Sequence, residues 1–294
     1  MPPELVDPSP LLTASRVTIV AGKGGVGKTT VTAVLARAAA GAGHRVLVVE
    51  LDGKPALRGL VGELEYEQIS APAALEEYLR DHGFGRVAKR LSASGVIDVV
   101  ATAAPGIDDI VVLGKIKQLE RSGNWDVIVV DGPAAGHAIP FLTSAAGLLD
   151  AVRGGPVRAQ ASDVVELLRD PERCQVVLVT LPETTPVNEA VQTAYALEDR
   201  VGVKLGPVVV NNVDAFGMQD VPDPADVDLD GVESARVLAA AARFRRARHA
   251  VQDDEIGRLG EQLALEQWYL PMLPVAGLGA DDIDSLAASL RSSA

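Results

Sequence analysis

A glycine-rich segment near the amino terminus carries the clearest chemistry in this sequence. Residues 22–29 spell G-K-G-G-V-G-K-T, which fits the phosphate-binding pattern G-x-x-x-x-G-K-[ST]. Its glycines allow the backbone to curl so that successive N–H groups point at phosphate oxygens. The helix expected at residues 28–41 presents its positive amino-terminal end to the same anion. We therefore expect a nucleotide to bind here, with Lys28 at its β- and γ-phosphates and Thr29 ligating Mg²⁺.

A second lysine, Lys23, stands near the start of this loop. This spacing is typical of the deviant-Walker class of P-loop ATPases, which the segment resembles. The resemblance implies that Lys23 crosses a dimer interface to the partner's nucleotide, and the alternative is an exposed lysine at a tolerant position. The residues expected to contact nucleotide in this segment are Gly22, Lys23, Gly24, Gly25, Val26, Gly27, Lys28, Thr29 and Thr30.

Carboxylates follow two of the predicted strands. Residues 45–51 form an apolar run that leads into Glu50-Leu51-Asp52, and residues 126–130 form another that leads into Asp131. Because ligands bind beyond the carboxyl ends of the strands in an open α/β sheet, both acids should face the phosphates. We expect Asp131 to hold a Mg²⁺-bound water. Asp52 would orient or deprotonate the attacking water and is a further candidate metal ligand, and Glu50 could share either task. A cap of a helix or turn is the alternative for each acid.

The elements that must position these residues alternate along the chain. Apolar runs predict strands at residues 16–21, 45–51, 96–101, 126–130, 175–180, 206–211 and 268–273. Longer patterned segments predict helices at residues 28–41, 107–121, 186–200, 232–267 and 281–291, the third capped by Thr185. This alternation predicts an α/β fold with a mostly parallel sheet and helices on both faces.

Other segments are shorter or less regular. Residues 71–93 suggest short helices broken at Gly83 and Gly85, and residues 137–170 suggest two helices joined near 153–156. Four prolines within residues 1–15 suggest a flexible leader. We therefore expect one P-loop domain over residues 16–294, with a small helical insertion around 138–172.

Charge and composition exclude several classes of function. The 27 basic against 40 acidic residues give a net charge of −13, which weighs against nucleic acid as a partner. Cys174 is the single cysteine, so one chain contains no disulfide and no multi-cysteine metal site. No apolar run reaches the ~18–20 residues that span a bilayer, and residues 1–12 lack the pattern of a secretory signal. These features lead us to expect a soluble, cytoplasmic protein without an integral membrane segment.

Further segments resemble the ArsA family of deviant-Walker ATPases, which includes arsenite-pump ATPases and targeting factors for tail-anchored membrane proteins. Residues 131–142 (DGPAAGHAIPFL) are similar to the family's second switch, and residues 52–57 (DGKPAL) stand where its first switch lies. Residues 105–108 (PGID), 208–211 (VVVN) and 271–277 (PMLPVAG) match further family segments in order. The resemblance implies ATP and Mg²⁺ as cofactors, ATP hydrolysis by a dimer, and contacts of Asn211 and Pro274 with the nucleotide base.

The departures from the family pattern also carry information. Pro55 replaces a histidine of the first switch, and Gly132, Ala135, Ala138 and Pro140 replace three threonines and an arginine of the second. The loss of switch hydroxyls suggests slow hydrolysis or dependence on a partner. A single cysteine weighs against metalloid pumping, which needs several thiolates, and no C-x-x-C pair is present for an intersubunit zinc site. Only 37 residues separate His137 from Gln175, which leaves room for two short helices but not for a large methionine-rich subdomain.

Three functions remain open on this reasoning. The first is a dimeric ATP-driven switch, paired with itself or with a related ATPase, that handles or targets a membrane or helical client. A small apolar groove for such a client could lie between residues 141–152 and 164–168. The second is a low-activity regulatory subunit that pairs with a more active relative, and the third is a positioning ATPase like ParA or MinD.

His137 and an arginine-rich segment each have a structural and a functional interpretation. We expect His137 to be structural or to communicate between sites, with proton transfer as the alternative. Four arginines lie within residues 243–248, followed by three acids at residues 253–255. We expect an exposed, self-neutralised helix there, and the alternative is a surface for an acidic partner or for anionic lipid.

Overall fold

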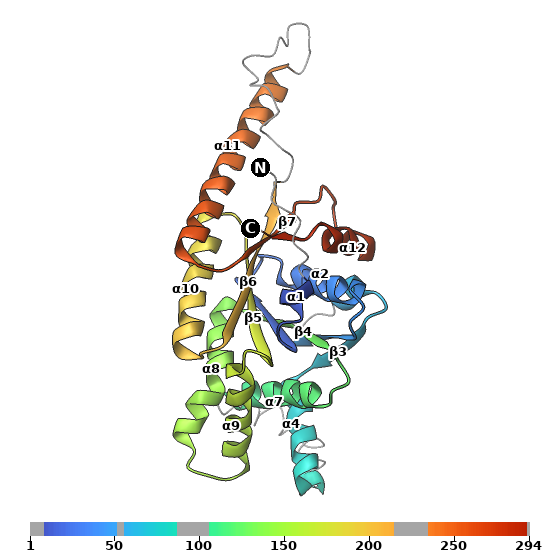
Figure 1. Cartoon of the computed structure of the whole chain (residues 1–294), viewed down its shortest axis with the longest axis vertical. Helices are drawn as coiled ribbons and strands as arrows, with labels where there is room; N and C mark the ends of the chain where they lie inside the picture. The colour runs from blue at the N-terminus through green and yellow to red at the C-terminus, as the bar shows by residue number, and fades with distance from the viewer. Residues whose placement is uncertain (1–8, 52–55, 87–105, 215–234, 293–294) are drawn as a thin grey trace.

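A single sheet organises the computed structural model, which describes residues 9–51, 56–86, 106–214 and 235–292. Within this part of the chain the sheet has eight strands in the order β3-β2-β4-β1-β5-β6-β7-β8. Their bounds are β1 Val17–Gly22, β2 Val46–Leu51, β3 Glu65–Ile69, β4 Val127–Ala134, β5 Cys174–Thr180, β6 Lys204–Val213, β7 Gln267–Pro271 and β8 Arg291–Ser292. The first seven are parallel, and β8 pairs antiparallel with β7 (Figure 1).

Helices cover both faces of this sheet, as the alternating pattern predicts. The described helices are α1 Ser9–Leu12, α2 Lys28–Gly41, α3 Arg58–Val61, α4 Ala71–Leu79, α7 Ile107–Arg121, α8 Ala135–Ala151, α9 Pro156–Arg169, α10 Thr184–Arg200, α11 Ala235–Gln262 and α12 Ala280–Ser289, with a π-turn over Arg80–Phe84. One layer holds α2, α3 and α12, and the other holds α4 and α7 to α10 (Figure 1). None of the described helices combines the length and apolar character that a bilayer span requires.

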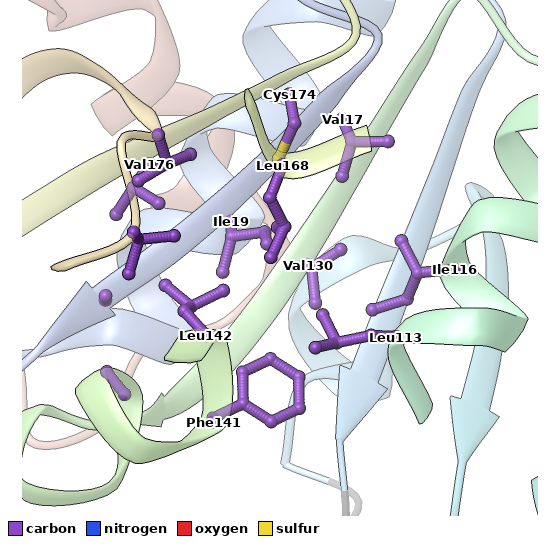
Figure 2. Packing of buried hydrophobic residues seen from close by; sticks show 14 of the residues in the cluster. Val17, Ile19, Leu113, Ile116, Val130, Phe141, Leu142, Leu168, Cys174 and Val176 are labelled. Carbon is purple, nitrogen blue, oxygen red and sulfur yellow. The ribbon is translucent and has the colours of Figure 1, made fainter. Parts of the chain in front are cut away.

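The two faces of the sheet have separate aliphatic cores. Strand residues alternate between them, so that Ile19 and Val130 belong to one cluster while Val20 and Val129 belong to the other. Figure 2 shows the first cluster, where Val17, Ile19 and Val130 of the sheet meet residues of α7, α8 and α9. Cys174 is fully buried there, and burial raises the pKa of its thiol to about 12. The core is built from aliphatic side chains because aromatic residues make up only 3% of the chain.

The same cluster contradicts the expected client groove. Phe141 is 5% exposed and Leu142 is 1% exposed, and both point into the core beneath the sheet (Figure 2). Val164 and Leu168 of α9 are buried beside them. These apolar side chains of α8 and α9 hold the helices to the sheet, so they do not line an open groove.

Several elements differ from the sequence prediction. β4 continues beyond Asp131 to Ala134, because its last residues still pair with β1 across an irregular register. β3 was not predicted, since its sequence EYEQI is polar and only Ile69 is buried in this strand beside β2. Thr185 is not the cap of α10: the N-cap residue is Glu183, and the hydroxyl of Thr184 donates to Glu255 instead. The strand expected at residues 96–101 lies outside the described residues.

Residues 9–15 are packed, which differs from the flexible leader expected for residues 1–15. Leu12 of α1 is 2% exposed in the cluster beside α2. Gln175 Nε2 donates to the Leu11 carbonyl at 3.0 Å, and Ser15 Oγ donates to the Pro171 carbonyl at 2.6 Å. The division of the rest of the chain into one domain with a helical insertion stays a prediction.

Candidate functional site

The glycine-rich loop connects the end of β1 to the start of α2, as expected of a phosphate-binding loop. Gly25 has a φ of 89° and Gly27 has a φ of 90°, a backbone conformation that residues with a side chain rarely adopt. Gly22 is required for a different reason, since a Cβ there would lie 2.5 Å from the carbonyl oxygen of Val179 on β5. The loop therefore curls in front of the amino-terminal end of α2, where helix N–H groups remain available to an anion.

Asn211, near the end of β6, holds this loop in place. Its side-chain Nδ2 donates to the carbonyl oxygen of Val26 at 2.9 Å, in the middle of the loop. A Cβ on Gly27 would lie 2.2 Å from the same nitrogen, so a glycine is needed there to leave room for the Asn211 side chain. Asn211 thus contacts the loop directly, in addition to the contact with a nucleotide base that the family resemblance implies.

Thr29 and Asp131 meet directly, although 102 positions separate them in the chain. Thr29 Oγ1 donates to Asp131 Oδ2 at 2.7 Å, and Thr32 Oγ1 donates to Asp131 Oδ1 at 3.4 Å. Burial raises the pKa of Asp131, and the hydrogen bond from Thr29 and the charge of Lys28 oppose that rise. Burial also lowers the pKa of the Lys28 ammonium, against the attraction of Asp131. A hydroxyl, a carboxylate and an ammonium are therefore gathered at the start of α2.

A hydroxyl and a carboxylate are the hard oxygen ligands that Mg²⁺ takes from protein, together with waters and substrate phosphates. Among the described residues there is no cluster of three or more histidine, cysteine, aspartate or glutamate side chains that could cage a metal. The pair of Thr29 and Asp131 fits a Mg²⁺ ion of this type, which completes its coordination from outside the protein. Asp52, the other expected ligand, lies outside the described residues.

Glu50 lies beside Asp131, since the two residues are partners in the pairing of β2 with β4. Its side chain is 3% exposed and accepts a hydrogen bond from the hydroxyl of Tyr66 on β3. Burial, together with this hydrogen bond and the nearby carboxylate charge, raises the pKa of Tyr66 to about 12. Tyr66 thus keeps Glu50 anchored toward β3.

Lys23 forms an ion pair within its own chain. Its Nζ lies 2.6 Å from Oε1 of Glu189 on α10, and the two side chains are 42% and 35% exposed. Lys28 Nζ donates to the backbone carbonyl of Lys23 at 3.3 Å. Both loop lysines therefore contact groups of their own chain, Lys23 through an ion pair and Lys28 through a backbone carbonyl.

A cavity of about 240 Å³ lies beside the loop. Gly25, Gly27 and Thr30 are among its lining residues, and so are Asn211 and Asn212 of β6. The remaining lining residues are Leu181, Pro271, Leu273, Val275, Leu278 and Leu286. A cavity lined by both apolar side chains and amides next to a phosphate-binding loop suits a flat heterocyclic base. Pro274 does not line it, but its neighbours Leu273 and Val275 do.

The structure also shows contacts that sequence reasoning missed. Glu189, Tyr66 and Thr32 carry no motif that would mark them, because each acquires its role by packing beside a residue distant in sequence. His137 is exposed at the start of α8, and its charge lowers the pKa of Asp109, which burial and Asp108 raise to about 6.

Comparisons with known proteins agree with this geometry. A family model described as anion-transporting ATPase (ArsA_ATPase) matches residues 15–153, the part that contains the loop, Glu50 and Asp131. ATPase BagA of Mycobacterium tuberculosis is 31% identical over 309 residues, covering 92% of this chain and 90% of that protein. An arsenical pump-driving ATPase of Escherichia coli is 31% identical over 229 residues, but the match covers 73% of this chain and only 38% of that longer protein.

Proposed function

Because this chain belongs to the ArsA family of ATPases, we propose that it is a Mg²⁺-dependent dimeric switch in which ATP draws two chains together and hydrolysis releases them. ATP hydrolysis is the activity of the family. The Mg²⁺ requirement, the dimer and the client are our proposals. The contact of Thr29 with Asp131 at the start of α2 is the observation that carries the Mg²⁺ requirement, because it gathers a hydroxyl and a carboxylate where a phosphate-bound cation would sit.

Each residue of the loop has a task that follows from its position. The N–H groups of residues 24–29 would surround phosphate oxygens, with Gly25 and Gly27 holding the left-handed curl. Lys28 would donate to the β- and γ-phosphates and neutralise charge that develops there. Bound Mg²⁺ would polarise the γ-phosphoryl group, with Thr29 and Asp131 as its protein-side supports. We retain Asp52 as the residue that orients the attacking water.

The partner is a second copy of this chain or a related ATPase. Support comes from Lys23, whose side chain is 42% exposed and is held by an exposed ion pair with Glu189. Departures such as Pro55 and Pro140 favour, as a second candidate, a regulatory subunit that binds ATP and relies on a more active partner. We propose a membrane or helical client and a cytoplasmic location. A positioning ATPase like ParA or MinD is the remaining alternative.

Steady-state hydrolysis with and without Mg²⁺ tests the proposal. We expect wild-type protein to turn over ATP and to shift from monomer to dimer when ATP and Mg²⁺ are added. Lys28→Ala removes a positive charge at the phosphates, and Asp131→Asn weakens the hold on Mg²⁺, so each should lower kcat by about 100-fold or more. Lys23→Ala should lose turnover and also dimer formation, whereas Asp131→Asn should still bind nucleotide.

Two results would redirect the assignment. Wild-type protein that binds ATP but neither hydrolyses it nor dimerises would exclude the self-paired switch and favour the regulatory subunit. Turnover that persists in Lys28→Ala would place the phosphates elsewhere in the molecule.

A further inference from the structure

Helix α11 carries a line of exposed apolar side chains. Val237 is 70% exposed, Phe244 is 70% exposed and Val251 is 50% exposed. These three residues are seven positions apart, so they lie along one side of the helix, with exposed Ala240 and Ala247 between them. With Leu238, this helix holds four of the seven large apolar side chains that are exposed in the described part of the chain. Figure 1 shows this end of α11 rising past the sheet and the other helices.

Arginines border this apolar line on both sides. At about 100° per residue, Arg236 and Arg243 lie along one edge of the line and Arg248 lies along the other. Residues 235–252 contain no acidic residue, in a chain whose net charge is −13. The amino-terminal half of α11 is therefore a basic and apolar surface on an acidic protein.

The acids that follow in sequence do not neutralise these arginines, which corrects the self-neutralised helix expected from the sequence. Asp253 Oδ2 lies 3.0 Å from His249 Nδ1. Glu255 pairs with Arg258 and accepts a hydrogen bond from Thr184 Oγ1 at 2.7 Å. Asp254 is exposed at the far end of the apolar line.

The guanidinium groups of Arg243 and Arg248 have no carboxylate neighbour along the helix. Positions three and four residues away from Arg243 and Arg248 hold no carboxylate, which is the spacing that an intrahelical ion pair needs. Arg236, Arg243 and Arg248 form no ion pair with any residue that the structure describes. Arg245 differs from them, because its Nη2 lies 2.7 Å from Oδ1 of Asp214, just after β6.

We propose that the amino-terminal half of α11, residues 235–251, is a docking surface for an anionic lipid bilayer. The line of Val237, Phe244 and Val251 would enter the boundary between headgroups and acyl chains. The arginines on both borders would reach lipid phosphates while their stems lie along the apolar surface. A helix that protrudes and presents its apolar line outward suits a flat surface. Acids that lie more than ~8 Å from this surface act weakly on it, because such separations are screened at physiological salt.

This docking does not require the proposed switch, because none of the residues of this surface belongs to the loop or to the cavity beside it. Binding is therefore expected without ATP, and a failure of ATP turnover or dimer formation leaves it unaffected. If both hold, α11 would bring a nucleotide-dependent switch to the membrane where its client resides.

Co-sedimentation of the full chain with vesicles, without nucleotide, tests the inference. We expect binding to vesicles of equal parts phosphatidylcholine and phosphatidylglycerol, and little binding to phosphatidylcholine alone. Each arginine near an anionic surface contributes about fivefold to affinity, so Arg243→Gln/Arg248→Gln should weaken the partition about 25-fold. Phe244→Glu should weaken it at least as much. Matched controls elsewhere are Val157→Glu on α9 and Arg200→Gln at the end of α10, which should bind as the wild type does.

A second measurement separates insertion from surface attraction. Cys174 is fully buried, so an environment-sensitive thiol label will react at an introduced cysteine. The label on Phe244→Cys should brighten with anionic vesicles, and the label on Val157→Cys should not. Absence of co-sedimentation with anionic vesicles would overturn the proposal. Binding that is equal in wild type, Phe244→Glu and the double arginine variant would overturn it as well, and an acidic protein partner would then be the occupant to examine.

Discussion

Lys23 is paired with Glu189 of its own chain, and this pairing bears on how the proposed dimer forms. The Nζ to Oε1 distance is 2.6 Å, and both side chains are partly exposed. A pair of this exposure contributes about 0.2–1 kcal/mol, so it is weak enough to be exchanged for a phosphate. The backbone carbonyl of the same lysine accepts from Lys28, so the two loop lysines are in contact.

A substitution of Glu189 tests this exchange. Glu189→Gln removes the charge that retains Lys23, so we expect ATP-dependent dimer formation at about two- to fivefold lower protein concentration. Sedimentation velocity with ATP and Mg²⁺ measures the shift, and Glu198→Gln on the same helix is the matched control. In a Lys23→Ala background the Glu189→Gln change should have no effect, and a persisting effect would mean that Glu189 acts through another group.

At the scale of elements, the end of β6 stabilises the loop that precedes α2. Asn211→Ala removes the hydrogen bond to the Val26 carbonyl and the amide that lines the adjacent cavity. A lost hydrogen bond of this kind costs about 1–2 kcal/mol, so we expect KM for ATP to rise roughly tenfold with a smaller change in kcat. Steady-state kinetics measure both constants. A large fall in kcat with unchanged KM would instead give Asn211 a role in the chemical step.

The packing of α7 predicts a pH dependence of stability. Burial of Asp109 and the nearby charge of Asp108 raise its pKa to about 6 from a usual value of 3.8. The folded state therefore binds this proton more tightly than the unfolded chain does. The free energy of unfolding should fall as pH rises from about 4 to about 6, through the protonation of this one group.

Urea denaturation across that window measures the effect. Asp109→Asn should flatten the pH dependence between about 4 and about 6, because asparagine does not titrate there. Asp126→Asn is an unsuitable control, because Asp126 is paired with Arg45, which lowers the pKa of that carboxyl to about 2, and the substitution would also break this pair. Asp199→Asn, on the exposed side of α10, serves instead. An unchanged slope in Asp109→Asn would assign the titration to another group.

At the scale of the molecule, the nucleotide site joins parts that are far apart in sequence. The loop after β1, Asp131 of β4, Asn211 of β6 and the segment after β7 converge at the carboxyl edge of the sheet. A ligand that binds there connects these parts and should stabilise the whole fold, because it binds only the native state.

Thermal unfolding checks this coupling. A non-hydrolysable ATP analogue with Mg²⁺ at 100 times its Kd contributes about 2.7 kcal/mol, which should raise Tm by roughly 5 °C in a chain of this size. Lys28→Ala should unfold near the wild-type temperature without ligand and lose most of the shift. A full shift in Lys28→Ala would show that the analogue binds at another place.

The sequence by itself determined the layers of the fold and the centre of the site. Buried apolar runs of β1, β2, β5 and β6 and the patterned helices α2 and α7 follow from local periodicity, which each segment carries alone. The loop at residues 22–29 could be identified because phosphate binding constrains residue type at fixed, short spacing. Asp131 followed from its position after an apolar strand.

Only the tertiary structure decided the contacts between distant segments. Nothing local marks Glu189 as the partner of Lys23, and the polar strand β3 exists because β2 offers it an edge. Sequence spacing predicts that the acids at residues 253–255 neutralise the arginines of α11, but Asp253 pairs with His249, and Glu255 pairs with Arg258 and accepts from Thr184. Spacing along a chain determines which groups could meet. Packing determines which of them do, because a side chain that is paired with one partner is not available to another.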